Sequence, residues 1–429
     1  MQYYSTSDNS YRTDLTRAIV HCVAPDGGLY MPASWPTVPK AFFNNIDQLS
    51  LTDIAYVVAN SLLGDDVDGA VLKKIVGDSL NFKIPLVELA DGIFALELFH
   101  GPSLSFKDVG TRFLARLYRH LAAGAGKTPG RINVLVATTG NSGGAIANAF
   151  LGLEGVEVFI LYPRGRLSRM QEAQFATLGA NTHPIEVRGT IDDCNQLVDT
   201  ALLDTELNSA LHLTSANSLN LGRVLPQIIY FFEACARLKA AGIDPSTADF
   251  AMPCGNLSNV TAAAMARKMG APIGSITGAC LPGVFADVAA EGKPVPPFNP
   301  AKGYPANLPR LWALYGGDTA AMRRDIHAAV FTPAQQEEAV RTVYSVFGYT
   351  AEPRSASAVA ALLRRTQNGR PGVALINTHP AKMLDRMTAI TGHAVELPLQ
   401  FNRFMAQTAK KDKIDPTLPA LRKILTKYN

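Results

Sequence analysis

Residues 132–162 read INVLVATTGNSGGAIANAFLGLEGVEVFILY, and their hydrophobic pattern predicts the fold class. The mostly apolar run at Ile132–Ala137 is typical of a buried strand, and Val156–Tyr162 forms a second run of the same kind. Between them lie a glycine-rich turn, Thr138–Gly144, and small residues that continue to Phe150 and favour a helix. A strand, a turn, a helix and a strand within about thirty residues form a βαβ unit, which implies a parallel sheet.

The same alternation recurs along the chain. Leu51–Leu63 is a predicted helix. Asp249–Pro253 is a predicted strand that runs into a loop at Gly255–Asn259, and Val260–Lys268 is a predicted helix after that loop. Val373–Ile376 is another predicted short strand. Because strands and helices alternate, we expect an α/β protein whose ligands bind at the carboxyl ends of its strands.

The chain, at 429 residues, is too long for one ordinary hydrophobic core, so we expect two or three packed domains. We expect a mixed α/β N-terminal region at 1–95, a small domain at 96–215 and a large domain at 216–400. The proline-rich stretch 283–310 has little periodicity and predicts an irregular surface insertion. The tail, 401–429, predicts a closing helix.

Composition and charge exclude several classes of protein. The net charge is only +4, and no Lys/Arg tract is interleaved with aromatic residues, so we expect no nucleic-acid partner. No run approaches the roughly 18 apolar residues that a membrane helix needs, and Met1–Asp8 has no signal-peptide pattern. The five scattered cysteines form no Cys-x-x-Cys pair, which argues against a disulfide framework or a metal site. We therefore expect a cytoplasmic protein, either a monomer or a homodimer.

Lys107 stands in an unusual environment, the turn Phe99–Asp108, which is crowded with Phe, Pro and Gly. Lysines usually occupy solvated helix faces. Partial desolvation would lower the pKa of the Lys107 amine and make it nucleophilic toward a carbonyl group. An exposed lysine that opens a helix is the alternative, and the spacing by itself does not decide between the two.

Two loops have the composition of anion-binding sites. The glycines of Thr138–Gly144 permit positive φ and close approach of the backbone to a ligand. The helix that follows offers free N–H groups to a carboxylate or phosphate, and the same holds for Gly255–Asn259. Either loop also fits a connection without a ligand. Gly124–Thr128 is similar to a P-loop, but Leu121 occupies the place of the required first glycine, so we reject that interpretation.

Three further side chains are candidates for chemistry. His100 and His379 each adjoin a Gly or Pro turn, where either a catalytic base or a hydrogen-bonded structural histidine fits. Arg223 follows a run of short polar residues and is able to clamp a phosphate; a helix-surface arginine is the alternative.

Several strings together resemble the threonine synthase family of pyridoxal 5′-phosphate (PLP) enzymes, which has the tryptophan-synthase-β fold, or fold type II. The string Phe-His-Gly-Pro-x-x-x-Phe-Lys-Asp at 99–108 is highly specific. The resemblance covers most of the chain in the family's order. Its segments are Asp26–Tyr30, Leu96–Asp108, Ser215–Ser218 with Arg223, Gly255-Asn256 and His379–Lys382.

The resemblance implies both a fold and an activity. The fold would contain two twisted, mainly parallel sheets flanked by helices, after an N-terminal region. The activity would be that of a PLP-dependent carbon–oxygen lyase, with PLP as the electron sink. It would convert a small phosphorylated amino acid, O-phospho-L-homoserine, and water into L-threonine and phosphate by γ-elimination and β-addition.

The resemblance also implies roles for individual residues. Lys107 would bind PLP covalently and then transfer protons. Asn141 would lie beside the 3′ oxygen of the coenzyme, and Thr139 and Ser142 would face the substrate carboxylate. The coenzyme phosphate would be bound by Gly255, Asn256, Leu257, Ser258 and Asn259, and the substrate phosphate by Asn217, Ser218 and Arg223.

The sequence departs from the family pattern at three places. Ser258 stands where the family has glycine, and Arg354 stands where histidine is common. Asn377, followed by Thr378, stands where a threonine would meet the pyridine nitrogen of PLP, and either residue would serve as a hydrogen-bond partner. These departures leave open a diverged PLP-dependent lyase or substitution enzyme that acts on a related phosphorylated or acylated amino acid and releases, for example, 2-oxobutyrate. A non-catalytic PLP-fold relic is a further alternative, against which the presence of Lys107 argues.

Overall fold

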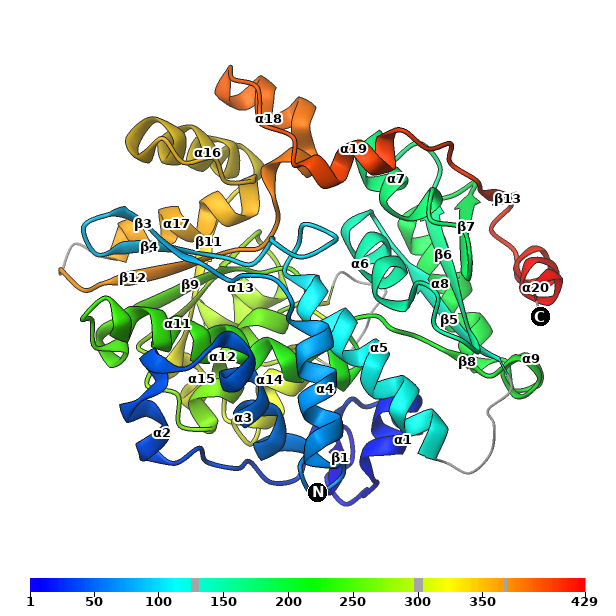
Figure 1. The fold of residues 1–429 in the computed structure, drawn as a ribbon, viewed down its shortest axis with the longest axis horizontal. Coiled ribbons are helices and arrows are strands. Elements are labelled where there is room, and N and C mark those ends of the chain that lie inside the picture. Colours follow the sequence, from blue (N-terminus) through cyan, green and yellow to red (C-terminus); the bar gives the residue numbers. More distant parts are fainter. Residues whose placement is uncertain (125–130, 297–303, 366–368, 429) are drawn as a thin grey trace.

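The computed structural model describes residues 1–124, 131–296, 304–365 and 369–428. Two helix-flanked β-sheets, a larger one at the left of Figure 1 and a smaller one at the right, form the molecule. Among the described residues, every strand pair in these two sheets is parallel except one. The predicted α/β fold with two mainly parallel sheets is therefore confirmed. The rejected P-loop candidate lies largely outside the described residues, since 125–130 is not among them.

The smaller sheet contains the βαβ unit at 132–162. Its strands, in spatial order, are β13 (Asp412–Ile414), β7 (Thr182–Val187), β6 (Val156–Pro163), β5 (Ile132–Ala137) and β8 (Leu213–Thr214). The predicted strands at 132–137 and 156–162 agree with β5 and β6, and the predicted helix between them is α6 (Asn141–Phe150). β5 and β6 are buried on both faces, which explains why their hydrophobic runs do not alternate.

The larger sheet collects strands from distant parts of the chain. Its spatial order is β11 (Ile326–Val330), β10 (Ile276–Cys280), β9 (Asp249–Pro253), β12 (Gly372–Ile376), β4 (Ile93–Glu97) and β3 (Leu86–Ala90). The two strands predicted from sequence, β9 and β12, are its central pair, and both are fully buried. The antiparallel pair is β3–β4, at one edge. Strands from the predicted N-terminal region thus complete the larger sheet; the predicted domain boundaries themselves stay a prediction.

Helices cover both faces of the two sheets. α12 (Ser258–Lys268) agrees with the helix predicted at 260–268, and α3 (Leu51–Leu63) has the predicted bounds. The helices around the smaller sheet also include α7 (Arg169–Ala176), α8 (Ile191–Leu203) and α9 (Thr205–Leu211). The remaining helices of the larger part are α5 (Lys107–Gly124), α10 (Leu221–Val224), η2 (Leu225–Gln227), α11 (Ile228–Ala240), η3 (Pro245–Thr247), α15 (Thr319–Asp325), α16 (Pro333–Phe347), α17 (Pro353–Arg365), η6 (Pro380–Met383) and α18 (Leu384–Thr391).

The first eighty residues form a small helical layer on the larger part. A two-stranded antiparallel ribbon pairs β1 (Tyr3–Ser5) with β2 (Tyr30–Pro32). The helices of this layer are α1 (Leu15–Val20), α2 (Lys40–Asn44), η1 (Ile46–Gln48), α3 and α4 (Gly69–Ser79). The layer is tied to the segment before α10, because Asn220 Nδ2 donates to the Ile19 carbonyl at 2.8 Å and Thr214 Oγ1 donates to the Val20 carbonyl at 2.9 Å.

The tail and the stretch 283–310 contain more regular structure than the sequence predicts. The predicted closing helix of the tail is α20 (Leu418–Lys427), and the tail also contains α19 (Leu399–Met405) and the strand β13, which extends the smaller sheet. The stretch 283–310 is not simply an irregular surface insertion. Within the described residues it contains α13 (Val284–Ala289) and the start of α14 (Leu308–Leu314), and the side chains of Asn307 and Arg310 are fully buried. Proline content masked both the helices and the burial, because proline is favoured at helix starts as well as in loops.

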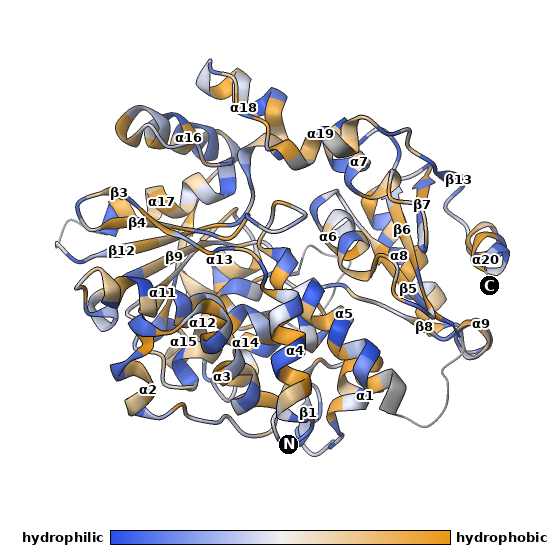
Figure 2. Ribbon diagram, in the orientation of Figure 1, coloured by the Kyte–Doolittle hydropathy of each residue, from blue (hydrophilic) through white to orange (hydrophobic). Residues whose placement is uncertain are grey.

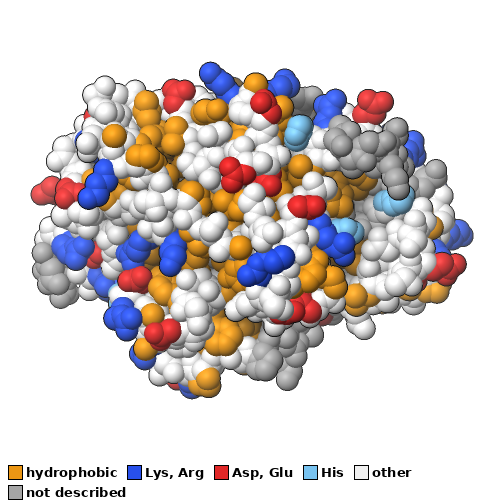
Figure 3. All heavy atoms as spheres, turned by 90° about the horizontal axis from the view of Figure 1, so that it is seen from below, with side chains coloured by type: hydrophobic (Ala, Val, Ile, Leu, Met, Phe, Trp, Pro, Cys, Tyr) orange, Lys and Arg blue, Asp and Glu red, His pale blue; other side chains and the backbone are white. Residues whose placement is uncertain are grey.

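Hydrophobic residues concentrate in the strands of both sheets, whereas the outer helices alternate between hydrophobic and hydrophilic positions (Figure 2). Basic and acidic side chains are interspersed over the lower face of the molecule (Figure 3), which fits the small net charge of +4. Across the described ranges, we find no helix of the length and apolar character that a membrane crossing requires.

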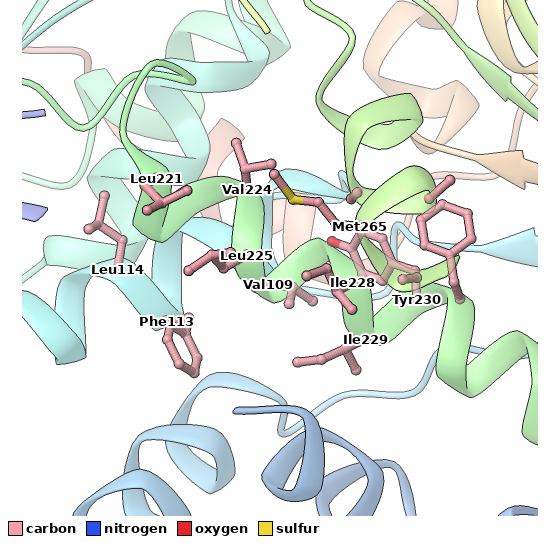
Figure 4. Packing of buried hydrophobic residues seen from close by; sticks show 14 of the residues in the cluster. Val109, Phe113, Leu114, Leu221, Val224, Leu225, Ile228, Ile229, Tyr230 and Met265 are labelled. Carbon is pink, nitrogen blue, oxygen red and sulfur yellow. The ribbon is translucent and has the colours of Figure 1, made fainter. Parts of the chain in front are cut away.

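Helix α5 begins at Lys107 and is anchored by one part of the main core (Figure 4). Its buried side chains face residues of α10, η2 and α11, and Met265 of α12 lies against the same group. The labelled residues are Val109, Phe113, Leu114, Leu221, Val224, Leu225, Ile228, Ile229, Tyr230 and Met265. Because densely packed side chains resist displacement, this core fixes where α5 starts.

Candidate active site

Strand ends from both sheets meet at one cavity of about 620 Å³. Lys107 lies beyond the end of β4, Asn141 follows β5, Gly255 follows β9 and Asn377 follows β12, and all four residues line the cavity. β4, β12 and β9 are parallel neighbours, so their carboxyl ends lie at the same edge of the larger sheet. This is the position at which open α/β sheets bind ligands.

The turn before Lys107 is held in place by the segment that follows β12. The Phe106 N–H donates to the Asn377 carbonyl at 2.7 Å, and Ser105 forms an isolated antiparallel bridge with Thr378. The segments 105–106 and 377–378 are far apart in the sequence, but their backbones pair as a short antiparallel ribbon. The ribbon fixes the position of Lys107 relative to the cavity.

The amine of Lys107 lies in the cavity and donates a hydrogen bond to Ser142 Oγ on the opposite wall. Burial, and then the positive charges of Arg223, Arg354 and Lys382, lower the pKa of Lys107 from 10.5 to about 7. An amine with this pKa has a substantial neutral fraction at neutral pH, which a nucleophile and a proton acceptor both require. Of the two interpretations that the sequence left open, the structure supports the desolvated lysine.

This lowered pKa predicts how the protein without coenzyme captures an aldehyde. Only the neutral amine attacks a carbonyl, so we expect the capture rate to rise with pH and to level off above a midpoint near 7. Stopped-flow absorbance of the coenzyme-free protein mixed with PLP measures this rate across neutral pH. A midpoint close to the 10.5 of a solvated lysine would contradict the assigned environment.

A fully buried lysine, Lys382, lies behind the turn and not on the cavity wall. Its Nζ donates to the Ser103 carbonyl at 2.7 Å, and the Ser103 N–H donates to Asp108 Oδ2 at 2.9 Å. Burial lowers the pKa of Lys382 and raises that of Asp108. The lysine and the carboxylate thus hold the Ser103 peptide from both sides, which stabilises the turn that ends at Lys107.

The loop after β5 has a geometry that requires glycine. Thr138 Oγ1 accepts hydrogen bonds from the backbone N–H groups of Gly140 at 2.9 Å and Gly143 at 3.0 Å. Gly140 has φ of 126°, and a Cβ at this position would lie 2.7 Å from Gln171 Cδ. Only glycine fits there. The loop therefore presents Asn141, the first residue of α6, to the cavity.

The loop after β9 is built around the N-terminus of α12. Leu257 adopts the left-handed conformation with φ of 64°, and the Ser258 N–H donates to Asn256 Oδ1 at 3.1 Å. Gly255, Asn256 and Asn259 line the cavity, whereas Leu257 and Ser258 are buried behind its wall. A strained non-glycine residue at a helix start is a feature of sites that bind a ligand, and the N–H groups of the first turn are suited to an anion.

In the segments that follow β5, β9 and β12, four buried polar atoms lack hydrogen-bond partners within the described part of the chain. They are Asn141 Oδ1, Ser258 Oγ, Asn259 Nδ2 and Asn377 Oδ1. Each unsatisfied group costs about 1–3 kcal/mol unless a ligand or water binds it. PLP offers phosphate oxygens to the donors Ser258 Oγ and Asn259 Nδ2. The acceptors Asn141 Oδ1 and Asn377 Oδ1 would pair with ring groups that carry a proton, a protonated 3′ oxygen and a protonated pyridine nitrogen. The residues present therefore fit PLP.

The predicted substrate-phosphate residues lie outside this cavity wall. Asn217 Oδ1 accepts from the Leu219 N–H at 2.8 Å, and Arg223 Nη1 donates to the Ala216 carbonyl at 2.8 Å. Arg223 is only 4% exposed, and its Nε has no partner among the described residues. Burial lowers the pKa of Arg223 to about 10. The positive charge of Arg223 is close enough to lower the pKa of Lys107. Asn217, Ser218 and Arg223 nevertheless do not line the cavity.

The two candidate histidines make structural contacts. His100 Nε2 lies 2.6 Å from Glu97 Oε2, and His379 Nδ1 accepts the Ala381 N–H at 3.1 Å, which caps η6. Burial, as the largest cause, lowers the pKa of His379 to about 4, so its ring stays neutral. Neither histidine lines the cavity, which favours the structural interpretation for both.

Sequence reasoning missed several residues of the cavity wall. Gln171 forms a capping box with Ser168 at the start of α7, and it also lines the cavity. The sequence pattern indicates only the capping role. Arg386 of α18 also lines the cavity and forms an ion pair with Glu337 at 3.1 Å. Arg354 was noted only as a departure from the family, although its charge contributes to the low pKa of Lys107. These residues come from helix surfaces, for which the sequence carries no local signal.

Comparisons with known proteins agree along the whole chain. Residues 2–80 match the family described as "Threonine synthase N terminus", and residues 81–378 match the family described as "Pyridoxal-phosphate dependent enzyme". The chain is 33% identical over 437 residues to the threonine synthase of Serratia marcescens, with 99% of each chain covered. It is 32% identical over 440 residues to that of Escherichia coli (strain K12), with 100% of each chain covered.

Solved structures give the same result. The crystal structure of threonine synthase from Escherichia coli has a TM-score of 0.90 at 29% identity and covers 100% of both chains. The PLP-bound threonine synthase from Brucella melitensis has a TM-score of 0.89 at 28% identity and covers 100% of this chain and 99% of the other.

The fold and the lysine-centred cavity define a PLP-dependent lyase of fold type II. PLP is its cofactor, as the match to the PLP-dependent family and the PLP-bound neighbour support. The chain belongs to the threonine synthase family.

Proposed function

We propose that the cavity converts O-phospho-L-homoserine and water into L-threonine and phosphate. The observation that carries this proposal is Lys107, a lysine with a pKa near 7 that lies in a cavity walled by unpartnered polar atoms. Similarity to threonine synthases over 99–100% of the chain supports the same activity.

PLP would be held at four points. Lys107 would bind its aldehyde carbon. Gly255–Asn259, here named the coenzyme-phosphate loop, would bind its phosphate with backbone N–H groups and with Ser258 Oγ, which the family's glycine lacks. Asn141 would lie beside its 3′ oxygen, and Asn377 or Thr378 would contact its pyridine nitrogen. The unpartnered donor Ser258 Oγ supports the phosphate contact, and the unpartnered acceptors Asn141 Oδ1 and Asn377 Oδ1 fit a protonated 3′ oxygen and a protonated pyridine nitrogen.

The substrate would be held at its two anionic ends. Thr139 and Ser142, which line the cavity next to Lys107, would bind the α-carboxylate. Asn217–Arg223, here named the substrate-phosphate segment, would bind the phosphate with Asn217, Ser218 and Arg223. The unpartnered Nε of buried Arg223 supports this role, because a buried guanidinium group gains most from an anionic partner. Asn217 and Ser218 are half-buried and Arg223 is buried, so Arg223 would meet the phosphate only after a local rearrangement of this segment.

PLP, when bound, withdraws electrons from the substrate and so acidifies its Cα and Cβ hydrogens. Lys107 Nζ is the group placed to accept the proton from Cα and to return one at the end of the reaction. A second proton leaves Cβ, phosphate departs from Cγ, Cγ gains a proton, and water adds at Cβ. The neutral form that the low pKa of Lys107 favours is the form that accepts a proton. The ordered walls around Nζ also limit stray water, which would divert the reaction.

Product analysis tests this proposal. Purified protein loaded with PLP and given O-phosphohomoserine is expected to release threonine and phosphate in equal amounts, because water adds after phosphate leaves. Chromatography of the amino acids and a colorimetric phosphate assay measure the two products. Release of phosphate with 2-oxobutyrate in place of threonine would contradict the proposal and would identify a diverged lyase.

We also infer that the protein works in a reducing compartment such as the cytoplasm. The five free cysteines, of which four are buried, support this inference. The partner is a small-molecule substrate, and the choice between monomer and homodimer stays a prediction.

A further inference from the structure

Asn307 and Arg310 lie between the two proposed phosphate-binding elements. Both side chains are fully buried, although they come from the end of the stretch predicted to be a surface insertion. Asn307 begins α14 as its N-cap residue, and Arg310 lies in the first turn of that helix. Burial of an amide and a guanidinium group is costly unless both are well hydrogen-bonded, so their partners are informative.

Asn307 contacts both elements with one side chain. Its backbone N–H donates to the Asn256 carbonyl at 3.0 Å, and its Nδ2 donates to the same carbonyl at 3.1 Å. The same Nδ2 lies 3.4 Å from the Ser218 carbonyl. Asn256 belongs to the coenzyme-phosphate loop and Ser218 to the substrate-phosphate segment. One amide group therefore joins the two elements.

Arg310 extends this link to the N-terminal layer. Its Nη1 donates to Asn307 Oδ1 at 2.7 Å, its Nη2 donates to the Leu219 carbonyl, and its Nε donates to the Tyr30 carbonyl at 3.1 Å. Across the described ranges, no carboxylate forms an ion pair with Arg310. Its guanidinium group keeps an uncompensated positive charge behind the substrate-phosphate segment, and burial lowers its pKa to about 10.

We propose that Asn307 and Arg310 are positioning residues that set the spacing between the coenzyme-phosphate loop and the substrate-phosphate segment. The inference rests on the proposed function, because it concerns the distance that one substrate must span. Its Cα reacts next to PLP while its phosphate leaves from Cγ, so both anion sites must be correctly spaced at the same time. A misplacement of about 1 Å costs roughly 100-fold in rate.

The two residues differ in what they contact, and this difference gives the test. Asn307→Ala removes the side-chain bond to each element and leaves only the backbone N–H bond to Asn256. The affinities for PLP and for inorganic phosphate are therefore both expected to fall, by about 10-fold. Arg310→Lys keeps the charge but loses the planar fork that binds Leu219 and Tyr30. We expect it to weaken the binding of inorganic phosphate by a similar factor. Because Arg310 reaches the coenzyme-phosphate loop only through Asn307, the PLP affinity is expected to fall by a smaller factor than the phosphate affinity.

Titration of the coenzyme-free protein with PLP, followed by absorbance, measures the first affinity. Calorimetric titration of the PLP-loaded protein with inorganic phosphate measures the second. Arg323→Lys is the matched control, because Arg323 also donates to two backbone carbonyls, those of Ala289 and Ala290, away from the cavity. It is expected to change neither affinity.

Asn307→Asp covers the case in which the alanine variant fails to fold. It is isosteric, but it replaces the shared donor with an oxygen that faces two carbonyls, so the same double loss is expected. A lower unfolding temperature with both affinities unchanged in Asn307→Asp and Arg310→Lys would overturn the proposal. If the wild-type protein forms no threonine, the proposed function fails, and these binding titrations still decide whether the two anion sites are linked.

Discussion

Replacement of Lys107 by alanine is expected to abolish threonine formation. The variant loses the group that binds the PLP aldehyde and that carries protons to and from the substrate. A positioned acid–base group alone contributes roughly 10²- to 10⁴-fold to the rate, and loss of the covalent attachment adds to this. Steady-state kinetics with O-phosphohomoserine measures the loss, and the absorbance of bound coenzyme reports the attachment.

Two further variants make this result specific. Lys107→Arg keeps a positive charge beside Ser142 but cannot form the covalent bond, so it is expected to be as inactive as the alanine variant. Lys73→Ala removes an exposed lysine of α4 and is expected to leave turnover unchanged. A small primary amine added to Lys107→Ala is expected to restore part of the activity by replacing the missing proton carrier. Full turnover by Lys107→Ala without added amine would refute the assigned role.

Replacement of Arg223 by glutamine is expected to raise the KM for the phosphorylated substrate strongly. A hydrogen bond to a charged group contributes about 1.5–3 kcal/mol, which corresponds to roughly 10- to 150-fold in affinity. The kcat is expected to change less than the KM, because the phosphate lies away from the Cα proton transfer. Initial-rate kinetics gives both constants, and competition by inorganic phosphate is expected to weaken in parallel.

The control for Arg223→Gln is a variant that removes the same single positive charge at a position away from the site. Arg237 of α11 forms an ion pair with Glu233 at 2.7 Å on the outer side of the core, so Arg237→Gln is expected to leave the KM unchanged. Arg223→Lys is expected to fall between wild type and Arg223→Gln, since it keeps the charge without the fork geometry. An unchanged KM in Arg223→Gln would remove Arg223 from the proposed substrate-phosphate segment.

The sequence predicts the central strands of the fold well because their hydrophobic signal is local. Ile132–Ala137 and Asp249–Pro253 are strands with the predicted bounds, and both are buried by helices on either face. The edges are harder to predict. β13, at 412–414, has only three residues and becomes a strand by pairing with β7, a partner more than two hundred residues away. Nothing in its own composition signals that pairing.

The same distinction applies to the candidate site. Lys107, Asn141, Gly255 and Asn377 each follow a strand, and parallel sheets bring such residues together at one edge. The sequence therefore predicts these cavity residues, although their individual roles stay predictions. Asn307 and the wall residue Gln171 could not be predicted, because each acts through contacts with segments far away in the chain.

The most direct test of the account concerns the bond between PLP and the protein. The purified protein is incubated with PLP, reduced with borohydride, digested and mapped by mass spectrometry. Two lysines have a lowered pKa, the half-buried Lys107 and the buried Lys382, but of these two only Lys107 lines the cavity. The account predicts a pyridoxyl group on the peptide that contains Lys107. A label on Lys382, or no label on either lysine, would contradict it.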